Sequence, residues 1–186
     1  DEGLGKTTAA FDLAGVLTGK SGKLWEEIRL WQRESSGKEP VVTFADDQVW
    51  YLRPMGMELK IEQFRLFLDA MATFDETVHV CIIDEAQTMM DPVANSLLKT
   101  LEEPEGNVHF ILITHDLGVV AQMCDEVIVM YAGSICERGT ADEIFYHAAH
   151  EYTKGLLRSI PNIDSDDKTR LVPISGTPID LLNMPK

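Results

Sequence analysis

Short apolar runs alternate with amphipathic stretches along this chain, a pattern typical of a protein built from both strands and helices. Runs rich in valine, isoleucine and aromatic residues predict short strands at 41–44, 48–52, 78–83 and 108–114. Apolar residues at helical spacing predict helices at 6–18, 60–71 and 92–103, and an exposed helix around 24–31. This order favours an α/β fold in which a mainly parallel sheet is flanked by helices.

Particular residues mark the ends of several predicted helices. Gly19 is expected to stop the first helix, and Asp91 is expected to cap the helix that Pro92 opens. Thr140 and Glu143 have the spacing of a capping box, which predicts that another helix begins directly after Thr140.

Beyond residue 115 the alternation of strands and helices gives way to a different pattern. Residues 126–139 predict a β-hairpin with a tight turn at Ala132-Gly133. Helices are predicted over 141–148 and 151–160. Residues 161–186 are polar and contain several prolines, so we expect an extended C-terminal tail there.

The composition narrows the class of protein. The chain has 186 residues, 45% of them hydrophobic, which is enough for one sizeable domain, or for one domain with an appendage. Its net charge of −15 argues against direct sequence-specific binding of nucleic acid. The three cysteines form no CxxC pair, which argues against a disulfide scaffold and against zinc. No apolar run reaches the roughly 18 residues of a transmembrane segment, and the first residues do not resemble a signal peptide, so we expect a cytoplasmic protein.

The first residues match the end of the phosphate-binding pattern GxxxxGK[ST]. In such a loop Gly3 and Gly5 let backbone N–H groups face phosphate oxygens. Lys6 would place a cation beside the β- and γ-phosphates, Thr7 would bind Mg²⁺, and Thr8 would complete the cofactor-binding set. The alternative is a glycine-rich turn that caps an ordinary helix. Because the sequence opens inside the pattern, we expect the strand that feeds this loop to precede the first residue, so that the chain is a fragment.

A second acidic motif follows the predicted buried strand at 78–83. Asp84 and Glu85 stand where the strand ends, as in a Walker B motif. In that role Asp84 holds Mg²⁺, directly or through water, and Glu85 polarises the attacking water. The alternative is an acidic turn after a buried strand. With a Gly-Lys-Thr run upstream, a nucleotide site for ATP and Mg²⁺ is the better interpretation.

His115 ends the next predicted strand and is a further candidate. At the carboxyl edge of a P-loop sheet a polar side chain can sense the γ-phosphate, although a histidine at a strand end is more often only a polar cap. The cysteines are interpreted as packing residues, since Cys81 lies in an apolar strand and the other two lack partners at ligand spacing.

Residues from about 1 to 114 resemble a bacterial DNA polymerase III clamp-loader subunit of the delta-prime or gamma/tau type. The resemblance rests on GLGKTT, then VWYLRPMGMELKIEQFR, then VCIIDEAQTMMDPVANSLLKTLEEPEGNVHFILIT, of which SLLKTLEEP is specific. It implies that Lys6 and Thr7 contact ATP and Mg²⁺ and that Asp84-Glu85 is the Walker B pair. The sequence departs from the family in three ways: it contains no zinc-binding cysteine cluster, no Ser-Arg-Cys motif to reach a neighbour's ATP, and no lid domain.

From about residue 111 to 186 the chain resembles the C-terminal part of a dipeptide/oligopeptide ABC importer ATPase. The resemblance rests on ITHDLGVVAQMCDEVIVMYAGSICERGTADEIFYHAAHEYTKGLLRSIP and on the final RLVPISGTPIDLLNMP. It implies that His115 is the switch histidine that contacts the γ-phosphate. The family's LSGGQ signature, Q-loop and D-loop do not occur in the sequence, so the resemblance predicts an incomplete ATP site.

The two resemblances meet in FILIT, which indicates a composite sequence, whether natural, designed or assembled from two genes. We expect residues 1–114 to be a clamp-loader-like ATPase core, residues 115–160 to complete its sheet, and residues 161–186 to be the tail. The strand missing from this P-loop fold would lie between 108–114 and 126–131. We therefore expect either that those two strands pair directly or that an apolar slot opens between them.

Three functions follow from these resemblances. The first is an ATP-binding module with weak or absent hydrolysis. The second is a non-hydrolysing interaction module that docks on clamp-loader subunits. The third is an ABC importer subunit that docks on a membrane permease or a second ATPase subunit, at the inner face of the plasma membrane. Catalytic competence is doubtful on sequence grounds, because both families complete their sites with residues from a neighbour.

Overall fold

The computed structural model describes residues 5–20, 44–45, 48–54, 56–73, 76–103 and 106–160. The chain divides into two compact units, one of residues 7–119 and the other of residues 1–6 with 120–186. No helix in the described ranges is long and apolar enough to cross a membrane. Gly3, the helix predicted around 24–31 and the predicted tail at 161–186 lie outside the described residues.

The unit of residues 7–119 is built on one sheet with the strand order β1-β2-β3-β4. Its strands are β1 (Phe44–Ala45), β2 (Val49–Leu52), β3 (His79–Ile83) and β4 (Val108–Leu112). Strands β2, β3 and β4 run parallel, and only β1 is antiparallel to its neighbour. The α/β fold with a mainly parallel sheet is therefore confirmed.

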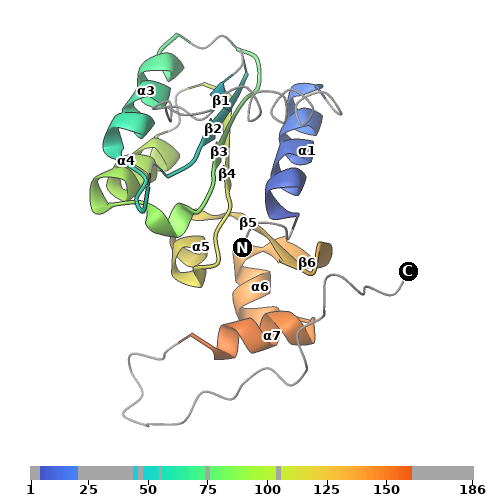
Figure 1. Cartoon of the computed structure of the whole chain (residues 1–186). Helices are drawn as coiled ribbons and strands as arrows, with labels where there is room; N and C mark the ends of the chain where they lie inside the picture. The colour runs from blue at the N-terminus through green and yellow to red at the C-terminus, as the bar shows by residue number, and fades with distance from the viewer. Residues whose placement is uncertain are drawn as a thin grey trace. The chain divides into compact units, whose positions relative to one another are not determined.

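Helices cover both faces of this sheet. Figure 1 shows α1 (Lys6–Thr18) on one face and α3 (Ile61–Met71) and α4 (Asp91–Glu102) on the other. All three lie where helical spacing predicted them. The face under α1 forms a core cluster of small and aliphatic residues with two aromatic rings, namely Ala10, Phe11, Ala14, Val49, Tyr51, Val80, Ile82 and Ile113.

The opposite face of the sheet is packed mainly by aromatic rings. The ring of Phe67 on α3 makes edge-to-face contacts with Trp50 of β2 at 5.8 Å and with Phe110 of β4 at 5.7 Å between centroids. Between the two packed faces, every residue of β3 is buried. This double burial explains why β3 is apolar at each position from Val80 to Ile83 rather than alternating.

The predicted N-cap of α4 is wrong by one residue. The cap is Met90, whose backbone is extended and whose carbonyl accepts the N–H groups of Val93 at 2.8 Å and Ala94 at 3.1 Å. Asp91 is already helical and makes no capping bond of its own. Its carboxylate instead stands in the first turn, where the positive end of the helix favours it.

Two short helices within the described residues were not predicted. These are η1, a 3-10 turn over Ala86–Thr88, and α5 (Leu117–Met123). Both are too short to show hydrophobic periodicity. The Asp116 carboxylate accepts the N–H of Gly118 at 2.7 Å, so an aspartate before an apolar stretch was the signal for α5.

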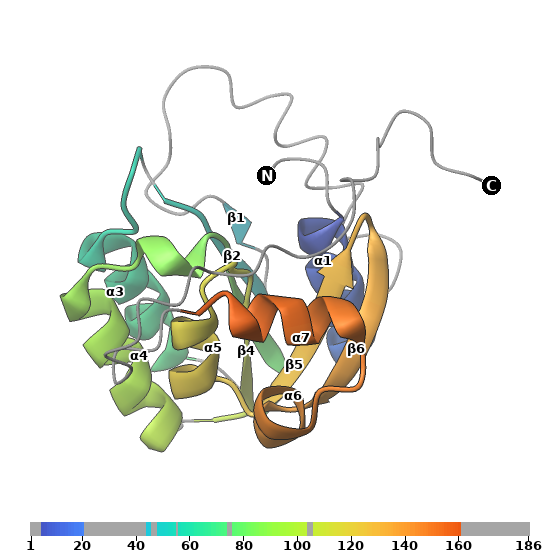
Figure 2. The same ribbon diagram turned by 90° about the horizontal axis from the view of Figure 1, so that it is seen from below.

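The second unit is built on the predicted hairpin. Strands β5 (Glu126–Tyr131) and β6 (Ser134–Thr140) pair antiparallel, and α6 (Ala141–His147) and α7 (Glu151–Arg158) pack against them (Figure 2). Thr140 and Glu143 form the predicted capping box. Within the described residues β5 pairs only with β6, so the direct pairing of 108–114 with 126–131 does not occur. The backbone hydrogen-bonding groups along one edge of β5 pair with β6, because the short turn between the two strands brings β6 directly alongside β5.

Side chains from both strands and helices hold this second unit together. Val127 and Val129 on one face of the hairpin pack against Ile144 of α6, which is 1% exposed. The rings of Tyr131 and Tyr152 lie 4.5 Å apart and connect β5 with α7. The unit therefore buries a small apolar core of its own.

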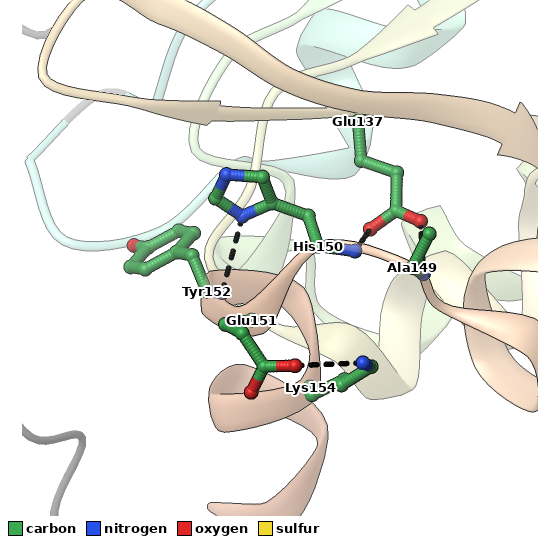
Figure 3. Close-up of polar contacts among 6 residues, drawn as sticks. All are labelled: Glu137, Ala149, His150, Glu151, Tyr152 and Lys154. Atoms are coloured by element: carbon green, nitrogen blue, oxygen red, sulfur yellow. Dashed lines mark hydrogen bonds and ion pairs between the residues drawn. The ribbon is translucent and has the colours of Figure 1, made fainter.

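A carboxylate on β6 fastens the start of α7. The Glu137 carboxylate accepts the backbone N–H of Ala149 at 2.6 Å and of His150 at 3.2 Å, while His150 Nδ1 accepts the N–H of Tyr152 at 3.1 Å (Figure 3). The buried Thr153 hydroxyl stands near the carboxylate but makes no hydrogen bond of ordinary geometry. The Thr153 hydroxyl and these N–H groups hold the pKa of Glu137 below its ordinary 4.5.

Glu137→Gln is expected to lower the thermal midpoint of the full chain at pH 7, since the anion is the better acceptor of these N–H groups. Because the pKa of Glu137 is lowered in the folded state, its stabilising effect is present above about 4.5 and lost as the pH falls through the folded value. Melting curves at pH 7 and in acid test this.

The matched control is Glu126→Gln, since the Glu126 carboxylate pairs with Arg138 at 3.1 Å on the exposed surface of the same hairpin. This exposed pair contributes little, so its loss should leave the midpoint nearly unchanged. Equal midpoints for the two variants at pH 7 would contradict the role of Glu137.

Candidate functional site

The candidate site lies where the buried strand β3 ends. Asp84 is the first residue after β3, and its backbone N–H still bonds to the carbonyl of Leu52 on β2 at 2.9 Å. The sheet therefore fixes the position of the Asp84 backbone. Because β2, β3 and β4 are parallel, their carboxyl ends meet at this edge, which is where open α/β sheets bind ligands.

Three donors surround the Asp84 carboxylate. The hydroxyl of Tyr51 donates to Oδ2 at 2.6 Å, and the hydroxyl of Thr7 lies 3.4 Å from the same oxygen. The N–H of Glu85 donates to Oδ1 at 2.9 Å. Thr7 and Asp84, 77 positions apart in the sequence, are thus brought together as the two predicted metal-binding residues. Sequence reasoning missed Tyr51.

The missed tyrosine is part of the core under α1. Tyr51 is 2% exposed, and its ring packs edge-to-face on Phe11 at 5.0 Å between centroids. Burial, together with the Asp84 carboxylate, raises the pKa of the Tyr51 hydroxyl far above its usual value of 10.0. Tyr51 therefore keeps its proton and acts as a hydrogen-bond donor.

Glu85 is held in an unusual backbone conformation. It has φ 51° and ψ 48°, the left-handed region that non-glycine residues seldom adopt. The turn is closed by Thr88, whose N–H at 2.8 Å and hydroxyl at 2.7 Å both donate to the Glu85 carbonyl. The side chain is exposed. Strain of this kind gathers at functional sites, where the surrounding structure holds the residue in place.

The end of β4 contributes a second polar group to this edge. Thr114 donates its hydroxyl to the side-chain oxygen of Gln87 at 2.9 Å and accepts the N–H of Asp116 at 3.0 Å. The predicted His115 lies between these residues and is exposed, and within the described parts of the chain it makes no hydrogen bond or ion pair. Gln87 lies 27 positions before Thr114, so no local pattern in the sequence pointed to this pair.

The other predicted residues lie at the start of α1. Gly5 has φ +74°, so this position favours glycine for its backbone rather than for lack of space. Lys6 and Thr8 occupy the first and third positions of the helix, and both are half-buried. The first turn of α1 contains no acidic residue, so nothing in that turn offsets the positive end of the helix.

The side-chain oxygen atoms of Thr7 and Asp84 are suitable ligands for a hard cation. A threonine hydroxyl and a carboxylate supply oxygen atoms, which Mg²⁺ prefers. In the described ranges no three His, Cys, Asp or Glu side chains gather into a metal site. Mg²⁺ commonly binds through one or two protein groups together with substrate phosphates, so the residues present fit a magnesium–nucleotide complex better than an isolated ion.

Comparison with known proteins assigns most of the chain to one family. Residues 1–122 match the family described as DNA polymerase III, delta subunit. The chain belongs to this family. Residues 136–186 match a second description, oligopeptide/dipeptide transporter, C-terminal region. The resemblance to both families is thus confirmed.

Curated relatives come from the transporter side. The chain is 47% identical over 108 residues to the oligopeptide transport ATP-binding protein OppD of Haemophilus influenzae. This match covers 56% of this chain and 33% of that protein. It is 48% identical over 109 residues to the dipeptide transport ATP-binding protein DppD of Bacillus subtilis, covering 57% and 32%. The chain therefore spans about a third of the length of these relatives.

A solved structure comes from the replication side. It is a DNA polymerase III gamma subunit-related protein from Thermotoga maritima. The sequences are 23% identical, the match covers 46% of this chain and 32% of that one, and the TM-score is 0.36.

Glu85→Gly is expected to raise the free energy of unfolding by about 1 kcal/mol, because glycine adopts the left-handed conformation without strain. Chemical denaturation of the full chain tests this. Glu103→Gly is the matched control, since Glu103 is an exposed glutamate with φ −128°. The control should bring no gain, and an equal or negative effect of Glu85→Gly would contradict the strain at this position.

Proposed function

We propose that the residues of α1 and the end of β3 form a binding site for ATP with Mg²⁺. The observation that carries this is the approach of the Thr7 hydroxyl to the Asp84 carboxylate, 3.4 Å apart at the carboxyl edge of the sheet. An ordinary glycine-rich turn has no reason to bring these two groups together. The relatives OppD and DppD are named as ATP-binding proteins, which supports the same assignment.

In this proposal each residue has a distinct role. Gly3, Gly5 and Thr8 contribute to the loop that receives the phosphates, and Lys6 neutralises their charge. Thr7 and Asp84 hold Mg²⁺, which screens the phosphates and orients them. Apart from Asp84, these residues lie in the first turn of α1 or directly before it in the sequence, so the helix and the lysine act on the same negative charge as the metal.

We further propose that hydrolysis is weak or absent. Glu85 would polarise the attacking water and His115 would contact the γ-phosphate, but both side chains are exposed, and among the described residues no hydrogen bond orients either of them. The sequence contains neither a Ser-Arg-Cys nor an LSGGQ motif to serve a neighbouring site. Binding, rather than turnover, is therefore the activity that these residues support.

Lys6→Ala is expected to weaken binding of Mg²⁺-ATP by at least about tenfold, since it removes a charge-assisted contact to phosphate. Isothermal titration of the full chain measures the affinity. Lys99→Ala is the matched control, because Lys99 is an exposed lysine on another helix. This variant should bind ATP with the affinity of the unmodified chain. If Lys6→Ala binds ATP with unchanged affinity, the site is wrongly assigned. Titration with GTP in parallel tests the choice of base.

The family assignment of residues 1–122 favours one further role, docking on clamp-loader subunits. In this alternative ATP is incidental, and the chain acts as an interaction module of the replication machinery. A pull-down against clamp-loader subunits, with and without ATP, is expected to capture them in at least one state. Capture in neither state would exclude this role.

The transporter relatives favour a second alternative, an importer subunit that docks on a membrane permease or a second ATPase subunit. Such a chain would be cytoplasmic and peripheral at the inner face of the plasma membrane. We expect it to co-fractionate with membranes only when an oligopeptide permease is produced in the same cells. Recovery in the soluble fraction under both conditions would exclude this role.

A further inference from the structure

The Tyr51 hydroxyl stands out among the groups of the core. It is a polar atom in a cluster whose other side chains are apolar, including Phe11, against which its ring packs. Burying a hydroxyl costs free energy unless it is hydrogen-bonded, and phenylalanine would fill nearly the same space. Packing alone therefore does not account for a tyrosine here. The hydroxyl has one evident use, the bond to Asp84.

The hydrogen bond from Tyr51 to Asp84 is short, and it reaches Oδ2, the carboxylate oxygen that Thr7 also approaches. At 2.6 Å, the separation from Tyr51 to Asp84 Oδ2 is in the range of a charge-assisted bond between a hydroxyl and an anion. Thr7 approaches the same oxygen, and the N–H of Glu85 occupies the other one. Tyr51 and Glu85 thus restrain the carboxylate from two sides and keep Oδ2 turned toward Thr7.

We propose that Tyr51 is a positioning residue that holds the Asp84 carboxylate in the orientation needed to bind Mg²⁺ together with Thr7. This inference rests on the proposed binding of ATP with Mg²⁺. Carboxylates that bind metal ions are commonly oriented by such hydrogen bonds from outside the ligand set. Tyr51 itself touches neither metal nor nucleotide in this role.

The test is the gain in ATP affinity that Mg²⁺ brings, measured for the full chain by titrating ATP with Mg²⁺ and again with EDTA. Tyr51→Phe is expected to reduce this gain by about tenfold, the lower end of the effect of such outer residues on metal binding. Its affinity for metal-free ATP should stay the same. Asp84 is only half-buried, so water can replace the lost donor and the fold should persist, which a melting curve verifies.

Tyr152→Phe is the matched control, a partly buried tyrosine of the other unit whose hydroxyl bonds no carboxylate among the described residues. It should keep the full gain. If Tyr51→Phe keeps the gain as well, the positioning role is overturned while ATP binding stands. If the unmodified chain shows no gain from Mg²⁺, the proposed function fails and this role fails with it.

A pair of unnatural residues separates donation from volume. At position 51, 4-fluorophenylalanine keeps nearly the size of the side chain but cannot donate, whereas 4-aminophenylalanine can. The amino variant should retain the gain from Mg²⁺ and the fluoro variant should lose it. Equal gains in the two variants would overturn the proposal. This pair also decides the matter if Tyr51→Phe does not fold.

Discussion

The burial of β3 on both faces is the constraint on which the candidate site depends. Because α1 packs on Val80 and Ile82 and the aromatic residues around α3 cover the opposite face of the sheet, a shift of β3 along the sheet would displace buried side chains on both faces. The residue that follows it is consequently placed at one point of the carboxyl edge. The packing of β3 thus sets the position of Asp84. Helix α1, which packs on the same strand, brings Thr7 close to it.

Several hydrogen bonds hold the Asp84 carboxylate in place at that edge. Two hydroxyls and one backbone N–H address the Asp84 carboxylate, and each donor belongs to an element held by the core or by the adjoining turn. Glu85, next in the chain, donates its N–H to that carboxylate and begins the turn that Thr88 closes onto its carbonyl. The strained residue and the carboxylate therefore belong to one turn, and a variant at either residue should be interpreted with the other in mind.

The two families that match this chain correspond to different physical systems. The unit of residues 7–119 depends on a buried parallel strand, whereas the hairpin unit depends on a small apolar core and on the Glu137 carboxylate that fastens α7. Each unit has its own sheet among the described residues. The boundaries expected at residues 114 and 160 stay predictions, as do the composite origin and the individual roles of the site residues.

The sequence by itself determined the helices at 6–18 and 60–71, the parallel strands and the hairpin, because hydrophobic period and turn residues are local signals. It also pointed to Thr7 and Asp84, since both stand in recognisable motifs. It could not reveal Tyr51, Gln87 or Thr114, whose importance arises from partners far along the chain. Nor could it place the cap of α4, which depends on where the backbone leaves the extended region. Tertiary structure decided these, because a hydrogen bond between distant residues exists only after the strands have been set side by side.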